Sequence, residues 1–324
     1  MSSFIRVRSK CLTRIFYACD VHGSQIVWKK FLQMGGYHKA DVLMMCGDLT
    51  GKAMVPVVKR KQDEWYYAPL GKEEVLHSEG EVKAAMDKIR DRGWYPFETT
   101  PNEVEELKAH PNKVNERFSA LMKQTLSGWL QMAEQELDKN TKVIVSPGND
   151  DRFDIDEAFD TSDRVINPLS RVVGIDEIHQ LISCEWTNPT PWNTPRQCSE
   201  DELRKKLEKE FKRVNKYDNL MCNFHAPPMN TVLDVAPKLD KDHKQVMQFG
   251  NPVNIHVGSE AIRQAIERYQ PFMTLHGHIH ESCGFENIGR TVCINPGSEY
   301  ESGLLRGYVI DLPPKKFEFW RVEA

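Results

Sequence analysis

The sequence predicts an α/β fold whose functional side chains lie at one edge of the strands. Apolar runs typical of buried strands recur along the chain, at residues 14–19, 42–46, 142–145, 220–223 and 272–275. Each run is followed within a few residues by side chains of the kinds that bind metal ions. Because binding sites gather at the carboxyl ends of strands in α/β sheets, we expect these side chains to meet at one site.

The first two strands flank a predicted helix, residues 24–36, which carries four apolar side chains on roughly one face. A strand, a helix and a second strand make a right-handed βαβ unit. Asp20 and His22 form a D-x-H motif after the first strand, and Asp48 follows a glycine after the second. In D-x-H two donors lie on the same side of an extended chain, so both can face one metal ion or two adjacent ions.

A long insertion, residues 52–140, separates the second strand from the third. Residues 54–58 and 64–68 are predicted to pair as a hairpin, and the remainder is predicted to be largely helical because apolar stripes recur at helical spacing. Core packing between helices is the simplest role for these stripes. The insertion could also form a lid over the site, with three candidate substrate contacts, Lys59, Arg60 and Tyr67.

The third strand leads into Gly148-Asn149-Asp150-Asp151, and a Pro-rich stretch, residues 186–196, comes later. The stretch should be stiff, which suits a wall of a substrate pocket. Arg196 and Asp151 are candidate substrate contacts, Arg196 through bidentate hydrogen bonds to a phosphate group. Alternatively, Arg196 pairs with an acid at the surface.

The last two ligand-bearing strands lead to His225 and to the H-x-H motif of His278 and His280. His276 shares a strand face with that motif and could support it, although a hydrogen-bonded structural histidine is the simpler interpretation. Three further strands, at residues 291–298, 307–311 and 316–320, are expected to complete a second sheet.

Together the motifs supply hard oxygen donors and imidazole nitrogens. This mixture suits manganese, iron, zinc or cobalt better than calcium or magnesium. A single such motif is commonly an ordinary turn or polar residue, but five in this order, each after a strand, predict a site for two metal ions. The predicted metal ligands are Asp20, His22, Asp48, Asn149, His225, His278 and His280.

This ordered set resembles the calcineurin-like metallophosphoesterases, whose pattern runs D-x-H, G-D, G-N-H-[DE], a lone His and G-H-x-H. The resemblance implies one domain over residues 1–324, a four-layer sandwich of two mixed β-sheets flanked by helices. It assigns Asp20, His22 and His280 to one ion and Asn149, His225 and His278 to the other, with Asp48 bridging both. Manganese is the expected metal, with iron, zinc, nickel or cobalt as alternatives.

The resemblance also implies the chemistry, in which a hydroxide that bridges the two ions attacks phosphorus. The expected catalytic residues are Asp48, Asn149, Asp150 and His225.

The chain departs from the family pattern at Asp150, where the family has the histidine that contacts the substrate phosphate. A carboxylate beside two cations should stay ionised and repel a dianionic monoester more than a monoanionic diester. We therefore expect a phosphodiesterase acting on a nucleotide-like substrate, with a phosphomonoesterase or nucleotide pyrophosphatase as alternatives. Equally, Asp150 or Asp151 could cap the segment near Asp154, while another histidine, His77 or His256 for example, replaces the missing one.

A different class of function stays open, a metal-binding scaffold that recruits a protein partner through the insertion. The net charge of −4 gives no general attraction to nucleic-acid polymers, and no apolar run is long enough to span a bilayer. Residues 1–8 lack the apolar core of a signal peptide, and none of the eight cysteines forms a C-x-x-C pair. These features predict a cytoplasmic protein, and the resemblance implies a small-molecule phosphate ester as its partner. The oligomeric state stays open.

Overall fold

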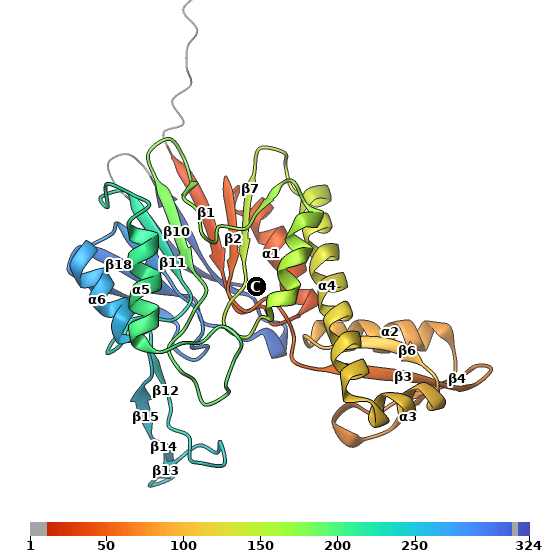
Figure 1. The fold of residues 1–324 in the computed structure, drawn as a ribbon. Coiled ribbons are helices and arrows are strands. Elements are labelled where there is room, and N and C mark those ends of the chain that lie inside the picture. The colour runs from red at the N-terminus through yellow and green to blue at the C-terminus, as the bar shows by residue number, and fades with distance from the viewer. Residues whose placement is uncertain (1–11, 313–316) are drawn as a thin grey trace, which may run out of the picture.

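Two six-stranded sheets packed face to face form the body of the protein, and helices cover their outer faces (Figure 1). The structure, a computed structural model, describes residues 12–312 and 317–324. Residues 1–8, whose sequence argues against a signal peptide, lie outside the described residues. The predicted four-layer arrangement of two mixed sheets and flanking helices is confirmed.

The first sheet has the strand order β20-β19-β1-β2-β7-β8. Its strands are β1 (Thr13–Ala18), β2 (Val42–Cys46), β7 (Lys142–Ser146), β8 (Val165–Ile166), β19 (Arg306–Leu312) and β20 (Glu318–Glu323). The three ligand-bearing strands, β1, β2 and β7, are parallel and lie in the centre of the sheet. The expectation that residues 307–311 and 316–320 complete the second sheet is wrong, because β19 pairs antiparallel with β1 and β20 pairs with β19. This pairing satisfies the edge of β1 that β2 leaves open. Lys316, within the second of those ranges, lies outside the described residues.

The second sheet has the order β17-β18-β16-β11-β10-β9. Its strands are β9 (Val173–Gly174), β10 (Gln180–Cys184), β11 (Leu220–Phe224), β16 (Met273–Leu275), β17 (Gly284–Ile288) and β18 (Thr291–Asn295). Strands β10, β11, β16 and β18 are parallel, so the chain leaves β11 and β16 at the same edge. The carboxyl ends of the ligand-bearing strands of both sheets therefore face one region.

Strand alternation divides the apolar residues into three layers of core. In β1, Ile15 and Tyr17 point into the core between the sheets, whereas Phe16 and Ala18 point toward the helices on the outer face. Helices α1 (Gln25–Tyr37) and α4 (Pro111–Glu136) pack on the first sheet, and α5 (Glu200–Phe211) and α6 (Glu260–Tyr269) pack on the second. The side chains of Ser199 and Ser259 cap α5 and α6.

The insertion projects from the body as a subdomain with its own sheet and core (Figure 1). The predicted hairpin is confirmed and belongs to a four-stranded sheet of order β5-β4-β3-β6, while helices make up most of the rest of the insertion. Its elements are β3 (Met54–Lys61), β4 (Glu64–Tyr67), η1 (Pro69–Gly71), β5 (Glu74–Leu76), α2 (Glu79–Asp91), β6 (Tyr95–Thr99) and α3 (Pro101–Ala109). Helix α4 connects it back to the body.

A second projection is a narrow arm that follows β11 (Figure 1). It consists of β12 (Val235–Pro237), β13 (Met247–Gln248), β14 (Asn251–Pro252) and β15 (Asn254–His256). Two short 3-10 helices, η2 (Phe153–Thr161) and η3 (Tyr300–Ser302), complete the chain. Within residues 12–312 and 317–324, none of the helices has the length and apolar character needed to span a membrane.

Candidate metal centre and its pocket

The structure brings the seven predicted ligands together where the parallel strands end. Their side chains follow β1, β2, β7, β11 and β16, which come from both sheets. Besides a set formed by His22, Asp48 and Asp150, two groups have ligand atoms within 4.8 Å of one another: Asp20, His22 and His280 in one, and Asp48, His225 and His278 in the other. These groups match the assignment of two ions implied by the motifs, although metal binding by these residues stays a prediction.

Asp48 lies between the two groups and faces each with a different oxygen. Its Oδ1 lies 3.3 Å from Nε2 of His225, and its Oδ2 lies 3.6 Å from Nε2 of His22. Nε2 of His22 lies 3.1 Å from Nε2 of His280, and Oδ1 of Asn149 lies 3.0 Å from Nε2 of His225. Asp48 therefore has the geometry of a bridging carboxylate, and Asn149 completes the second group.

The backbone is strained at several of these residues. Asp20, His22, Asp48 and His278 all have positive φ angles, of 54°, 41°, 44° and 68°. Side chains other than glycine rarely adopt this conformation, and such strain is characteristic of functional sites. Gly47 has a φ of 98°, and a Cβ there would lie 2.1 Å from Nδ1 of His225. The glycine before Asp48 is therefore required by the close approach of the histidine.

Burial and mutual charge set the protonation of the two groups. Burial lowers the pKa of His278 to about 3 and also lowers that of His22, so both imidazoles are neutral and have lone pairs to offer. Burial opposes charge on His225 too, but the carboxylates of Asp48 and Asp20 outweigh it and raise the pKa of His225 to about 9. A proton on His225 thus neutralises carboxylates that a divalent cation would otherwise neutralise.

The residues fit a pair of divalent ions. Two carboxylates, an amide oxygen and four imidazoles converge, and Nδ1 of His22 is buried without a hydrogen-bond partner among the described residues. This donor set is typical of manganese, iron, zinc or cobalt sites. Such ions would also offset the negative charge of the buried carboxylates of Asp20 and Asp48.

A set of neighbours fixes the orientation of the ligands. Thr194 accepts a hydrogen bond from Nδ2 of Asn149 at 2.8 Å, which directs the amide oxygen of Asn149 toward His225. The backbone N–H of His278 donates to Asp20, and the hydroxyl of Ser298 donates to the carbonyl of Asp20. These contacts fix the orientation of the donors.

His276 is a satisfied structural residue, as the simpler interpretation held. Its Nδ1 lies 2.8 Å from the carbonyl oxygen of Phe224 and 2.9 Å from that of Ala226, and its Nε2 lies 2.7 Å from the hydroxyl of Thr274. Burial lowers the pKa of His276 to about 4, so the ring is neutral. It ties the end of β16 to the end of β11.

Asp151 is a buried brace, which corrects its interpretation as a substrate contact. Its carboxylate accepts hydrogen bonds from the backbone N–H groups of Leu49, Thr50 and Gly148, each at 2.8 Å, and from the hydroxyl of Thr50. It therefore joins the loop that carries Asp48 to the loop that carries Asn149.

Arg196 is also structural, which corrects the expectation that it binds phosphate. The side chain is 1% exposed and donates to the carbonyl oxygens of Asp151 and Arg152 and to the carboxylate of Asp156. Its guanidinium lies over the ring of Phe153. Pairing with an acid, the other interpretation, is what the structure shows, and the pair lies beneath the loop that bears Asn149.

Asp150 lies at the floor of the pocket and does not cap a helix. The residue before η2 is Arg152, and its side chain makes no capping hydrogen bond. The backbone N–H of Asp150 donates to Asp48 at 2.9 Å, and its carboxylate pairs with Nζ of Lys52 at 2.6 Å. Lys52 is the functional candidate that the sequence reasoning missed; no motif surrounds it, and its partner lies far away in the sequence.

The other proposed replacements for the missing histidine lie elsewhere. His77 makes its contact within the insertion, where its backbone N–H donates to Glu81. His256 is held by Asp234, with Nδ1 2.7 Å from the carboxylate. Neither residue belongs to the lining of the pocket in the described part of the chain, whereas His243 does.

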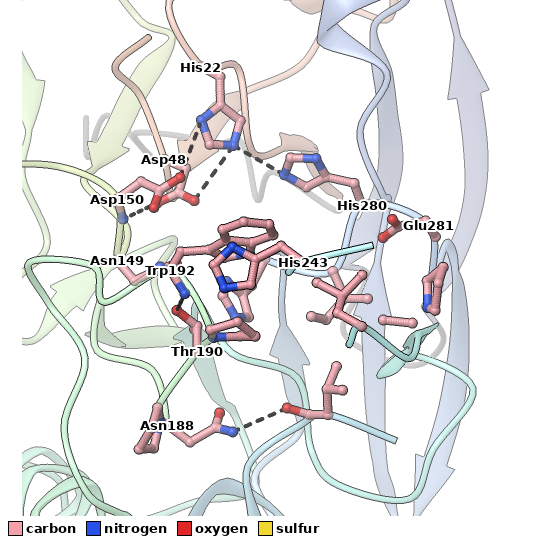
Figure 2. Close-up of a pocket in the computed structure, with 18 of the residues that line it drawn as sticks. His22, Asp48, Asn149, Asp150, Asn188, Thr190, Trp192, His243, His280 and Glu281 are labelled. Carbon is pink, nitrogen blue, oxygen red and sulfur yellow. Dashed lines mark hydrogen bonds and ion pairs between the residues drawn. The ribbon is translucent and has the colours of Figure 1, made fainter. Parts of the chain in front are cut away.

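The candidate metal centre opens into a pocket of about 730 Å³ (Figure 2). The Pro-rich stretch lines it as expected, and Trp192 stands beside His243 from the arm, with ring centroids 4.6 Å apart. The ring of Tyr300 lies 4.7 Å from that of His22. The pocket thus combines charged groups with aromatic and proline side chains.

Of the insertion, Lys52 alone among the described residues lines this pocket. Lys59 lies over the ring of Trp65, and Arg60 pairs with Glu73. The hydroxyl of Tyr67 donates to Glu74. The suggested substrate contacts of a lid are therefore engaged within the subdomain in this structure.

Comparison with known proteins agrees with this architecture. No family model matches the chain. An uncharacterised protein of Methanocaldococcus jannaschii is 33% identical over 163 residues, which are 50% of this chain and 66% of that relative. A crystal structure 15% identical in sequence aligns over 96% of this chain and 99% of its own with a TM-score of 0.58. The TT1561 protein of Thermus thermophilus, 10% identical, aligns over 95% and 98% with a TM-score of 0.51.

Both alignments cover nearly the whole chain, so this chain shares its overall fold with these two structures, and it has the two mixed sheets flanked by helices that the resemblance implies. The ordered ligand motifs of this chain lie at the ends of β1, β2, β7, β11 and β16.

Proposed function

We propose that the protein is a metal-dependent phosphoesterase with a dinuclear centre. The observation that carries the proposal is the pair of ligand groups on either side of Asp48, which open into a pocket. Two divalent ions held there would neutralise phosphoryl oxygens and activate water for attack on phosphorus.

The residues of the chain divide the remaining tasks. Asp48 sets the spacing of the two groups, and Asn149 is held ready by Thr194. The buried neighbours exclude bulk water from the ligand side, which strengthens electrostatic interactions within the site. Asp150 and Lys52 face the pocket side, where a substrate would approach.

The proposed substrate is a phosphodiester with a planar, nucleotide-like substituent. Trp192 is 58% exposed and lies beside His243, so it offers a flat surface near the metal centre. Pro189 and Pro191 adjoin it and add apolar surface. Aromatic side chains bind nucleobases by stacking, and a pocket of this size has room for substituents on both sides of a diester phosphate.

Phosphomonoester or nucleotide pyrophosphate hydrolysis is the second candidate, and one contact favours it. The ammonium of Lys52, 2.6 Å from Asp150, offsets the carboxylate that would repel a dianionic monoester. The carboxylate of Asp150 therefore disfavours a monoester less than the sequence alone indicates, and the pocket's room and exposed Trp192 favour a diester more strongly. A metal-binding scaffold is the remaining alternative, but it would not require all seven ligands.

The test compares turnover of the manganese-loaded protein on an activated aryl phosphodiester and on the matching monoester at one pH. A preference for the diester would support the phosphodiesterase proposal, and comparable or faster monoester cleavage would contradict it. Turnover of neither ester, with two ions bound, would favour the scaffold.

Asp48→Asn separates the catalyst from the scaffold. The substitution removes the charge that faces both ligand groups, so nearly all turnover should disappear while the chain stays folded. Asp160→Asn is the matched control, because Asp160 is exposed on η2 outside the pocket lining. Unchanged turnover in Asp48→Asn would refute the dinuclear mechanism.

A further inference from the structure

We propose that Lys52, positioned by Asp150, binds the phosphoryl oxygens of the substrate and supplies the positive contact that the G-N-D-D sequence lacks. The inference rests on the proposed function and adds the residue that recognises the phosphoryl group at that site. It also gives Asp150 a role as the residue that positions Lys52.

The position of Lys52 supports this role. Its Nζ lies 2.6 Å from Oδ2 of Asp150, and the same oxygen lies 4.0 Å from Nδ1 of His22 in the first ligand group. The Lys52 side chain is 56% exposed. Asp150 occupies one of the three ammonium donors, so two donors are free to face a ligand in the pocket.

Lys52 is the sole lysine or arginine among the described residues that line the pocket. The lining contains the carboxylates of Asp48, Asp150, Glu281 and Glu301. Without Lys52, the metal ions would be the only cations to face a phosphate ester that enters this part of the pocket, and the protein surface around them would be predominantly acidic. Replacement of a histidine by an aspartate alone would worsen that repulsion, whereas the aspartate–lysine pair restores the balance of charge.

The backbone that carries Lys52 is held tightly. The N–H of Gly51 donates to the hydroxyl of Tyr95 on β6 at 2.8 Å. A Cβ on Gly51 would lie 1.8 Å from the carbonyl oxygen of Gly93 and 3.2 Å from that of His22. The base of the insertion is therefore packed against the backbone of a metal-ligand candidate, which fixes where the Lys52 side chain begins.

An ordinary surface ion pair would not require this arrangement. Exposed pairs contribute little to stability and tolerate mobile side chains. Here the backbone N–H of Asp150 donates to Asp48, which fixes the position of Asp150. Lys52 directly follows Gly51, whose backbone is closely packed. Lys52 is held as a preorganised anion contact, in which little side-chain entropy is lost when the anion binds.

The experiment measures the affinity of the manganese-loaded protein for inorganic phosphate by calorimetry, together with the number of ions bound per chain. Lys52→Met keeps the length of the side chain and removes its charge, so phosphate affinity should fall by at least about tenfold with two ions still bound. Lys52→Arg should recover most of the affinity, because the contact depends on a point charge. Lys61→Met is the control, since Lys61 is 70% exposed and pairs with Glu64 within the insertion.

A second substitution tests the role of Asp150. In the Lys52→Met background the carboxylate of Asp150 faces the anion without its partner, so adding Asp150→Asn should recover about fivefold or more of the lost affinity. A merely structural role for the pair would give no such recovery.

The Lys52 proposal would be overturned if Lys52→Met bound two ions and its phosphate affinity stayed within twofold of that of the parent. If the parent were active, the proposed function would remain intact. A parent protein that binds two ions but neither binds phosphate nor cleaves either ester would overturn both.

Discussion

Replacement of Asp151 by asparagine should destabilise the protein and loosen its metal centre. The substitution keeps the shape of the side chain but converts one acceptor oxygen into an NH₂ group. If the NH₂ group replaces Oδ2, the N–H groups of Leu49 and Gly148 lose their acceptor. If it replaces Oδ1, the N–H and the hydroxyl of Thr50 lose theirs. In either orientation two hydrogen bonds to a buried charge disappear.

The magnitude follows from those two bonds. Hydrogen bonds to a charged group are worth about 1.5–3 kcal/mol each, so their loss costs about 3–6 kcal/mol. Burial, and then the nearby charge of Asp48, raise the pKa of Asp151. The asparagine therefore recovers part of the cost of burying a charge, and we expect a net loss of about 3 kcal/mol.

Urea unfolding of the metal-free protein measures this change, with Asp160→Asn as the exposed control. Because Asp151 joins the loops that bear Asp48 and Asn149, manganese affinity should fall as well. A free energy of unfolding within 1 kcal/mol of the parent, with unchanged metal affinity, would refute the assignment of Asp151 as the brace between these loops.

Three further predictions concern the site. His276→Phe should lower the free energy of unfolding by about 3 kcal/mol in a urea titration, because it leaves the carbonyls of Phe224 and Ala226 and the hydroxyl of Thr274 unpaired; a change below 1 kcal/mol would contradict this role. Manganese affinity of the parent, measured by calorimetry, should rise about tenfold per pH unit from pH 7 and level off above pH 9, because the ion must displace the proton of His225, whose pKa is about 9. A flat profile would argue against displacement of that proton. Trp192→Ala should raise KM about tenfold for a nucleoside phosphodiester and leave kcat nearly unchanged. The KM for a methyl phosphodiester, which has no base to stack, should change little. An equal effect on both esters would contradict stacking on this ring.

The strands and the ligand positions could be predicted from the sequence because their signals are local. An apolar run followed by Asp20 and His22, or by His278 and His280, encodes both a strand and the donors at its end. Which donors group together came from the resemblance that these motifs carry, not from their order or spacing. The fold class followed from the same residues.

What the sequence could not predict depends on contacts between distant segments. The ion pair of Lys52 with Asp150 joins the first residue of the insertion to the loop that follows β7. Arg196 has the chemistry of a phosphate ligand, and only its burial against Asp156 shows that it is structural. Likewise, residues 306–312 read as a strand, but their alternation does not specify whether they pair with β1 or with β18. Side-chain type and periodicity carry no information on such pairings.

The most direct test of the dinuclear centre is anomalous diffraction from crystals of the protein grown with manganese. We predict two peaks about 3.5–4 Å apart, both in contact with Asp48. One should lie beside Asp20, His22 and His280, and the other beside Asn149, His225 and His278. A single peak, or none at these residues, would contradict the proposed metal centre and the hydrolytic mechanism built on it.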